Sequence, residues 1–168
     1  MSKSRLQVTS DGSHTLYNEG VGETYHSSFG AIQESKHIFI TGGLLPALNT
    51  NKKHLKILEV GTGTGLNVLL TFQISEKSNH EIEYMGFDPF PPFKNEVHKL
   101  NYPELLNIPK EVFYRIHSTV DEEINLSGSF VFTNNRTKIQ EAELRITIMM
   151  WFFLMLFQRM LNPNYGLH

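Results

Sequence analysis

The chain has 168 residues, of which 40% are apolar and 19% charged, with a net charge of −2 and no cysteine. This length accommodates one domain, and the ordinary composition excludes a collagen-like chain, a long disordered tail and a coiled coil. The absence of cysteine excludes a disulfide scaffold, a thiolate-bound metal and a cysteine nucleophile, and the small net charge provides no general attraction to nucleic acid.

The N-terminal region is predicted to be a polar loop followed by a helix. It begins without an apolar segment, so we expect no signal peptide and a soluble, cytoplasmic protein without a membrane anchor. Residues 9–30 are rich in Gly, Ser, Thr and His, which is typical of loops. Residues 31–40 combine helix formers with an apolar end, and we expect Gly42 and Gly43 to end that helix.

The middle of the chain alternates short apolar strands with helices. The apolar run at 55–60 leads directly into a glycine-rich turn, as a buried parallel strand does. The elements expected after it are a helix at 66–73, a strand at 82–88, a helix at 96–106, a strand at 129–133 and a short helix or turn at 137–144. This alternation predicts an α/β domain with a parallel sheet.

The glycine-rich turn carries the most informative local motif, Glu59-Val60-Gly61-Thr62-Gly63-Thr64-Gly65-Leu66-Asn67. A strand that leads through glycines into a helix brings backbone N–H groups and a helix N-terminus together, and the glycines let a ligand approach the backbone. Such a turn is typical of a nucleotide-type cofactor pocket at the carboxyl end of a parallel strand. The alternative is a turn with a purely structural role.

The spacing of the glycines separates two cofactor classes. A dinucleotide fingerprint, G-x-G-x-x-G, would have its third glycine at Leu66, whereas here it falls one position earlier, at Gly65. The pattern E-x-G-x-G-x-G resembles instead the first motif of S-adenosylmethionine-dependent methyltransferases. Asp88 ends the second strand, roughly twenty residues beyond the turn, where a carboxylate would accept hydrogen bonds from ribose hydroxyls in either class.

Three stretches together resemble one family: DGSHTLYNEGVGETYHSSFGAIQESKHIFI, LEVGTGTGLNVLL and YMGFDPFPP. The resemblance, over about 9–144, is to the tRNA wobble-uridine methyltransferases, which form half of the bifunctional enzyme that makes 5-methylaminomethyl-2-thiouridine and also occur alone. It implies a class I, Rossmann-like α/β fold, S-adenosylmethionine as cofactor, and N-methylation of 5-aminomethyl-2-thiouridine at the anticodon wobble position of tRNA. A separate FAD-dependent oxidoreductase in the same pathway is a further implied partner.

The resemblance also implies the residues of a cofactor site. They are Glu59, Gly61, Gly63, Gly65 and Asn67 for the turn, Asp88 for the ribose, Pro91 for the turn behind it, and Tyr17, Gly22 and Glu23 for an N-terminal segment that closes over the cofactor. His14, Tyr25 and His26 lie in that segment without an assigned role, and a loop hydrogen bond is the simpler interpretation for each. No metal is expected. The acidic catalytic residue would come from a D-A-F-x-P motif after the fourth strand, which this chain lacks, so the catalytic residue is unknown.

The chain departs from the family pattern after Leu144. The run ITIMMWFFLMLF at 146–157 is too short to span a bilayer, which needs about 20 residues, and is more typical of a buried helix or strand. When each codon is started on the third base of the old one, Met149-Met150-Trp151-Phe152 becomes Asp-Val-Val. The flanking residues then permit Y-D-V-V-F-F-D-A-F, Ser or Pro, and P-x-L-W, which is the missing motif. We therefore hypothesise a frameshift between Leu144 and Ile148.

The domain expected from this resemblance covers residues 1–168. It comprises an N-terminal cap segment at 1–54, a cofactor-binding half at 55–144 and an aberrant tail at 145–168. In the class I strand order 3-2-1-4-5-7-6, loss of the fourth strand and of those after it leaves the first strand at an edge. We therefore expect an incomplete fold and impaired methyl transfer.

Two other functions stay open. A same-fold methyltransferase with a small-molecule acceptor agrees with the weak net charge, because RNA-binding proteins usually carry a basic face. Lys52, Lys53 and Lys56 form only a thin basic patch, which a solvated loop explains. A non-catalytic remnant would bind the cofactor without methylating any acceptor.

Overall fold

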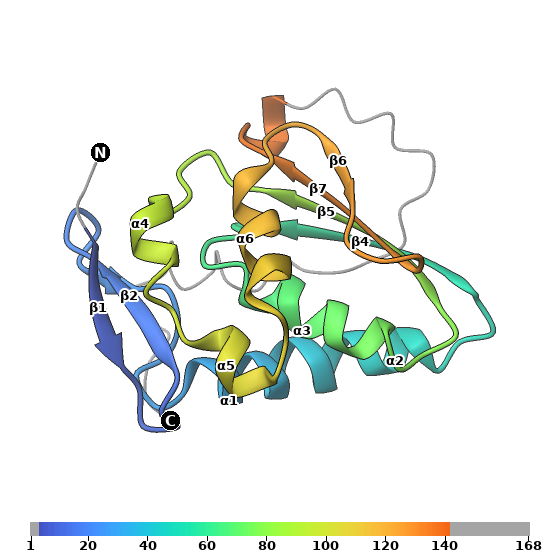
Figure 1. Cartoon of the computed structure of the whole chain (residues 1–168), viewed down its shortest axis with the longest axis horizontal. Coiled ribbons are helices and arrows are strands. Elements are labelled where there is room, and N and C mark those ends of the chain that lie inside the picture. The colour runs from blue at the N-terminus through green and yellow to red at the C-terminus, as the bar shows by residue number, and fades with distance from the viewer. Residues whose placement is uncertain (1–3, 142–168) are drawn as a thin grey trace.

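The computed structural model describes residues 4–141. Its main sheet has the order β4-β5-β7-β6, in which β4 (His54–Val60), β5 (Glu81–Phe87) and β7 (Phe130–Asn135) are parallel and β6 (Glu123–Asn125) is antiparallel (Figure 1). The three parallel strands match the predicted ones to within two residues at each end. The prediction of an α/β domain with a parallel sheet is confirmed.

The first strand of the glycine-turn unit lies at one side of this sheet. Within residues 4–141, β4 pairs with β5 alone, in a register that runs from His54 opposite Glu81 to Val60 opposite Phe87. The order β7-β5-β4 is the 3-2-1 half of a class I sheet, as expected. Because both strands end at the same edge, the turn after Val60 lies beside the loop after Phe87.

The N-terminal loop prediction is wrong. Residues 4–24 form a small antiparallel sheet of β1 (Ser4–Val8), β2 (His14–Asn18) and β3 (Glu23–Thr24). Leu16 of β2 is buried. Asp11 holds the turn between β1 and β2, because its carboxylate accepts hydrogen bonds from Ser13 N–H at 2.9 Å and from Thr9 Oγ1 at 2.7 Å. Polar residues therefore stabilise a hairpin here through pairing that composition does not reveal.

The predicted helix at 31–40 forms, but the two glycines do not end it. α1 (Ala31–Ser35) continues into a π-helix, η1 (Lys36–Leu44), and then into α2 (Leu45–Leu48). Phe39, Ile40 and Leu44 are buried along this segment. Each glycine costs about 1 kcal/mol in a helix, which is less than burial of these large side chains contributes.

The helices on the remaining part of the chain are α3 (Leu66–Ser75), α4 (Lys94–Val97), α5 (Tyr102–Leu106), α6 (Lys110–Ser118) and the 3₁₀ turn η2 (Ile139–Glu141). The helix expected at 96–106 is thus two short helices, since Pro103 is tolerated only in the first turn of a helix and so begins a new one. Neither α6 nor β6 was predicted from the sequence. Asn107, with φ of 54°, ends α5 in the left-handed conformation.

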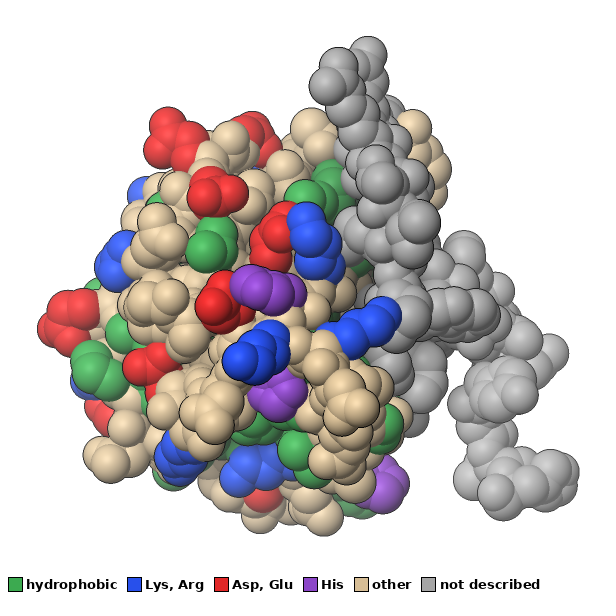
Figure 2. Space-filling view, turned by 90° about the vertical axis from the view of Figure 1, so that its right-hand side faces the viewer, with side chains coloured by type: hydrophobic (Ala, Val, Ile, Leu, Met, Phe, Trp, Pro, Cys, Tyr) green, Lys and Arg blue, Asp and Glu red, His purple; other side chains and the backbone are tan. Residues whose placement is uncertain are grey.

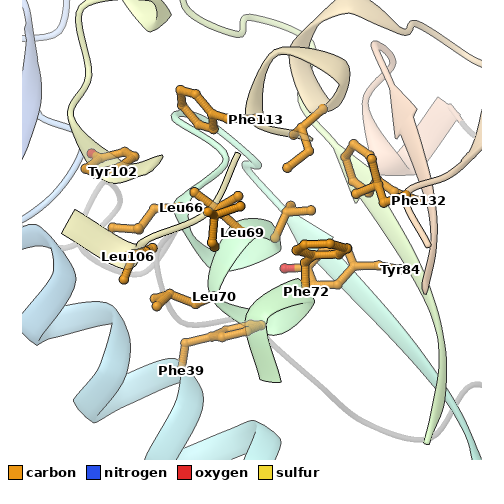
Figure 3. Packing of buried hydrophobic residues seen from close by; sticks show 14 of the residues in the cluster. Phe39, Leu66, Leu69, Leu70, Phe72, Tyr84, Tyr102, Leu106, Phe113 and Phe132 are labelled. Atoms are coloured by element: carbon orange, nitrogen blue, oxygen red, sulfur yellow. The ribbon is translucent and has the colours of Figure 1, made fainter. Parts of the chain in front are cut away.

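Aromatic side chains form the centre of the core between the sheet and the helices. Tyr84 from β5 packs against Phe132 from β7, with ring centroids 5.9 Å apart, and Phe72 from α3 meets Phe130 edge-on at 5.8 Å (Figure 3). Leu69 and Phe113 bring α3 and α6 into the same cluster. This packing fixes α3, and with it the turn that precedes α3, against the sheet.

The hypotheses about the C-terminal tail at 145–168 concern residues outside the described range. No helix within residues 4–141 is long and apolar enough to cross a membrane.

Candidate functional site

The turn between β4 and α3 has three glycines in the left-handed region. Their φ angles are +83° at Gly61, +51° at Gly63 and +72° at Gly65. The turn is tied to the sheet by a hydrogen bond of 2.7 Å from Gly61 N–H to Phe87 O and is closed by one of 2.9 Å from Gly65 N–H to Thr62 O. A residue with a Cβ would be strained at each glycine.

Asp88 lies directly beside the turn, as expected of the residue that ends the second strand. Its carboxylate accepts hydrogen bonds from Gly63 N–H at 2.7 Å and from Phe90 N–H at 2.9 Å. Burial raises the pKa of this carboxyl, while the two backbone hydrogen bonds and nearby Arg136 oppose the shift. Pro91 is half-buried in the loop that follows.

A second carboxylate, that of Glu59, lies inside the protein at the end of β4. Its side chain is buried and accepts a hydrogen bond of 2.8 Å from Asn67 Nδ2 in the first turn of α3, and the Tyr84 hydroxyl faces it. Burial raises the pKa of Glu59 to about 7. These contacts tie the strand to the helix on either side of the glycines, so Glu59 and Asn67 shape the turn from inside.

The N-terminal segment reaches the turn through two residues to which the sequence assigned no role. A Cβ built at Gly63 would lie 2.9 Å from Cδ1 of the Tyr25 ring, so Tyr25 covers this glycine. His26 Nε2 lies 2.7 Å from Thr64 Oγ1. Burial raises the pKa of Tyr25 to about 12, with Asp88 adding to the shift, and lowers the pKa of His26 to about 4.

The other residues expected in that segment lie on the hairpin sheet. Tyr17 pairs with Thr24 across β2 and β3, and its hydroxyl would lie 3.9 Å from a Cβ at Gly22. Glu23 is exposed, and its side chain makes no hydrogen bond or ion pair with another residue of the described range. The structure thus brings Tyr25 and His26 to the turn, whereas Tyr17, Gly22 and Glu23 stay on the hairpin.

His14 also lies apart from the turn. Its Nδ1 is 2.9 Å from the backbone oxygen of Lys99, and its N–H donates to Asn101 Oδ1 at 2.9 Å. It therefore ties β2 to the segment between α4 and α5, as a loop hydrogen bond would.

One residue that contacts the turn was not predicted from the sequence. His117, in the last turn of α6, is buried with its Nε2 3.1 Å from Thr64 O, and a Cβ at Gly65 would lie 2.8 Å from the same nitrogen. Burial lowers the pKa of His117 to about 4. The spacing of Phe113, Ile116 and His117, all buried, is that of one helix face and could have revealed α6.

The described residues leave several hydrogen-bond donors available at the turn. In residues 4–141 the N–H groups of Thr62 and Thr64 donate no hydrogen bond, and the first N–H groups of α3 have no partner within the helix. Together with the Asp88 carboxylate they suit a ligand that carries both oxygens and hydroxyl groups. No group of three His, Asp or Glu in this part of the chain is placed to hold a metal ion.

The thin basic patch lies at the opposite end of the sheet. Lys56 stands near the amino end of β4 and forms an ion pair of 2.7 Å with Glu83, and His54 pairs with Glu81 at 3.0 Å. Figure 2, which views the end from which the strands of Figure 1 start, shows basic, acidic and histidine side chains interspersed on this face. Among the described residues visible there, charges of both signs alternate, and this face lies at the opposite end of the sheet from the glycine turn.

Comparison with known proteins finds no matching family model. The chain is 30% identical over 113 residues to the tRNA 5-methylaminomethyl-2-thiouridine biosynthesis bifunctional protein MnmC of Aromatoleum aromaticum, an alignment that covers 64% of this chain and 17% of the relative. It is 41% identical over 67 residues to the protein of the same name from Burkholderia multivorans, covering 40% of this chain and 10% of the relative. The chain thus spans a small part of the length of these relatives.

A solved structure is similar in fold. MnmC2 from Aquifex aeolicus matches 86% of this chain and 47% of its own chain, with a TM-score of 0.58 and 25% identity. The chain is therefore MnmC-like in sequence and has the Rossmann-like fold that the sequence predicted. By their names, the MnmC relatives take part in the biosynthesis of 5-methylaminomethyl-2-thiouridine in tRNA.

Proposed function

We propose that this MnmC-like chain binds S-adenosylmethionine at the glycine turn and derives from an enzyme that N-methylates 5-aminomethyl-2-thiouridine at the wobble position of tRNA. The observation that carries the proposal is the contact between Asp88 and Gly63, which brings an acceptor and a turn with available donors together at the ends of β4 and β5. The names of the MnmC relatives supply the substrate class.

The residues present fit such a cofactor. Gly61 leaves the backbone open, since nothing lies within 4 Å of a Cβ built there, and the Asp88 carboxylate has further lone pairs for ribose hydroxyls beside the two it uses on Gly63 and Phe90. When bound, the cofactor supplies an electrophilic methyl group. The glycine turn would hold the cofactor, and the N-terminal segment around Tyr25 would exclude water from it.

We infer that methyl transfer by the chain as it stands is impaired. The D-A-F-x-P motif expected to orient the acceptor amine does not occur in this sequence. The same proposal divides a single domain over 1–168 into a cap segment at 1–54, a cofactor-binding half at 55–144 and an aberrant tail at 145–168. A location in the cytoplasm and a separate FAD-dependent oxidoreductase in the same pathway belong to the same proposal.

Titration calorimetry of the full chain with S-adenosylhomocysteine tests the cofactor. Binding with a stoichiometry near one that Asp88→Asn weakens supports the proposal, and absence of binding by the folded wild type overturns it. Methyl transfer from labelled S-adenosylmethionine to tRNA that carries 5-aminomethyl-2-thiouridine, against unmodified tRNA as control, then separates a residual enzyme from a non-catalytic remnant.

A small-molecule acceptor is the second candidate function. The net charge of −2 favours it, because RNA-binding proteins usually carry a basic face. A binding assay with an anticodon stem-loop at several salt concentrations distinguishes the two candidate functions. Salt-dependent binding of the stem-loop identifies RNA as the acceptor.

A further inference from the structure

Thr64 lies at the centre of the glycine turn and is held by two buried histidines from different parts of the chain. His26, from the N-terminal segment, places Nε2 2.7 Å from the Thr64 hydroxyl. His117, from α6, places Nε2 3.1 Å from the Thr64 carbonyl oxygen. Thr64 itself is 1% exposed and the two histidines are 8% and 7% exposed, so water does not compete for these contacts.

The chemistry of the partners determines the protonation of His117. A carbonyl oxygen only accepts hydrogen bonds, so His117 Nε2 must carry the proton and donate it. The Thr64 hydroxyl can donate or accept, so His26 can contact it in either neutral tautomer. Burial lowers the pKa of both rings to about 4, so both are neutral at pH 7, and both nitrogens that face the turn are engaged.

The turn needs external support because its own residues do not make it rigid. Thr64 is flanked by Gly63 and Gly65, and glycine adopts left- and right-handed conformations about equally well. The hydrogen bond from Gly65 N–H to Thr62 O orients the peptide group after Thr64, but this one local contact does not hold the turn by itself. The two histidine contacts and the Tyr25 ring against Gly63 do so from outside.

We propose that His26 and His117 are positioning residues that clamp Thr64 and hold the glycine turn in the conformation that accepts the cofactor. This inference rests on the proposed function, since it assigns the role of two residues in the same site. It also couples the site to its surroundings: His26 links the turn to the N-terminal segment, and His117 links it to α6.

The groups that face the two histidines allow them to stay neutral. Glu34 Oε2 lies 3.9 Å from His26 Nδ1, and the Tyr102 ring stands edge-on to His26 with centroids 6.3 Å apart. Phe113 packs edge-on against His117 at 5.0 Å, and Arg136 and His98 disfavour a positive charge there. The Glu34 carboxylate favours a charged His26 ring, but from outside hydrogen-bond distance, and the hydrogen bond to the Thr64 carbonyl favours a charged His117 ring.

Matched pairs of variants in the full chain test the clamp. His117→Leu removes the donor and His117→Gln keeps an N–H donor, while Thr64→Val removes the hydroxyl and Thr64→Ser keeps it. The exposed His54, at the far end of β4, provides the control His54→Leu. We expect His117→Leu and Thr64→Val to raise the Kd for S-adenosylhomocysteine about tenfold or more, at a temperature where both are folded. His117→Gln, Thr64→Ser and His54→Leu should stay within about threefold of the wild type.

Two outcomes separate this inference from the proposed function. Wild-type binding that His117→Leu and Thr64→Val leave unchanged overturns the clamp alone, and so does an equal loss in His117→Leu and His117→Gln. Failure of the wild type to bind overturns the proposed function and the clamp with it. Ring ¹⁵N shifts add a readout that does not depend on the cofactor. A neutral His117 protonated at Nε2 at pH 6 supports the clamp, and protonation at Nδ1 contradicts it.

Discussion

The carboxylate of Asp88 accepts a hydrogen bond of 2.7 Å from the backbone N–H of Gly63, and this contact joins the carboxyl ends of the neighbouring parallel strands β4 and β5. Gly63 is covered on its other side by the Tyr25 ring. One glycine thus lies between the acidic residue of the second strand and the N-terminal segment, which makes it the most constrained point of the site.

Asp88→Asn is expected to weaken binding of S-adenosylhomocysteine by about tenfold or more. The amide retains one acceptor oxygen but turns an NH₂ group toward one of the two N–H donors, those of Gly63 and Phe90, which that carboxylate now satisfies. Calorimetric titration measures the effect, and Glu122→Gln, at an exposed position, is the control. Equal affinities of Asp88→Asn and the wild type would remove Asp88 from the site.

Gly63→Ala is expected to destabilise the fold by about 1–3 kcal/mol. The new Cβ meets the Tyr25 ring at 2.9 Å, and the φ of +51° is unfavourable for alanine by about 1–2 kcal/mol. Urea unfolding measures the change, with Gly128→Ala as the matched control because nothing lies within 4 Å of a Cβ there. An unfolding midpoint of Gly63→Ala equal to that of the wild type would contradict this prediction, because the turn would then accommodate the new Cβ without cost.

Glu59→Gln is expected to stabilise the protein at pH 8 and to have little effect at pH 5. Burial raises the folded-state pKa of Glu59 to about 7, from an ordinary value of 4.5. A group whose pKa is raised by folding contributes most below its unfolded pKa, and that contribution is lost as the pH rises through the folded value. Glutamine keeps the acceptor for Asn67 without the charge, so the gain at pH 8 is on the order of 1–3 kcal/mol. Denaturant titrations at the two pH values test this, and a loss of stability at pH 8 contradicts it.

Acid is expected to destabilise the protein between about pH 6.5 and pH 4 through His26 and His117. Burial lowers the pKa of each to about 4, so the unfolded chain binds more protons in this window and stability falls as the pH falls. The effect is on the order of 3 kcal/mol for each histidine before relaxation of the structure. Thermal unfolding between pH 4 and pH 7 measures it. The double variant His26→Gln/His117→Gln should flatten the profile, and an unchanged profile would contradict the prediction.

Resequencing the encoding DNA across the codons for Ala142 to Trp151 tests the frameshift hypothesis. A gained or lost base that continues the protein through Y-D-V-V-F-F-D-A-F would restore the motif with the acidic residue. That chain is then expected to methylate tRNA that carries 5-aminomethyl-2-thiouridine. Shifted codons that yield stops or unrelated residues would contradict the hypothesis, and the chain as printed would then bind cofactor at most.

The sequence by itself determined the parallel strands, the glycine turn and the identity of its acidic partner. These features are encoded locally: apolar runs of strand length, glycines at fixed spacing and one Asp at a strand end are sufficient to predict them. Asp88 lies beside the turn because adjacent parallel strands end at one edge. The family resemblance rests on these residues together with the N-terminal stretch DGSHTLYNEGVGETYHSSFGAIQESKHIFI.

Only the tertiary structure decided which side chains support the turn. The side chains in question are those of Tyr25, His26 and His117. His26 lies 38 residues before Thr64 in the sequence, and His117 lies 53 residues after it. Contacts between residues so far apart in the sequence produce no periodic pattern from which they could be predicted. The hairpin over 4–24 and the helix that passes through Gly42 and Gly43 likewise depend on burial and pairing supplied by distant parts of the chain. Local propensity is worth about 1 kcal/mol per residue, and the packing of a core side chain exceeds it.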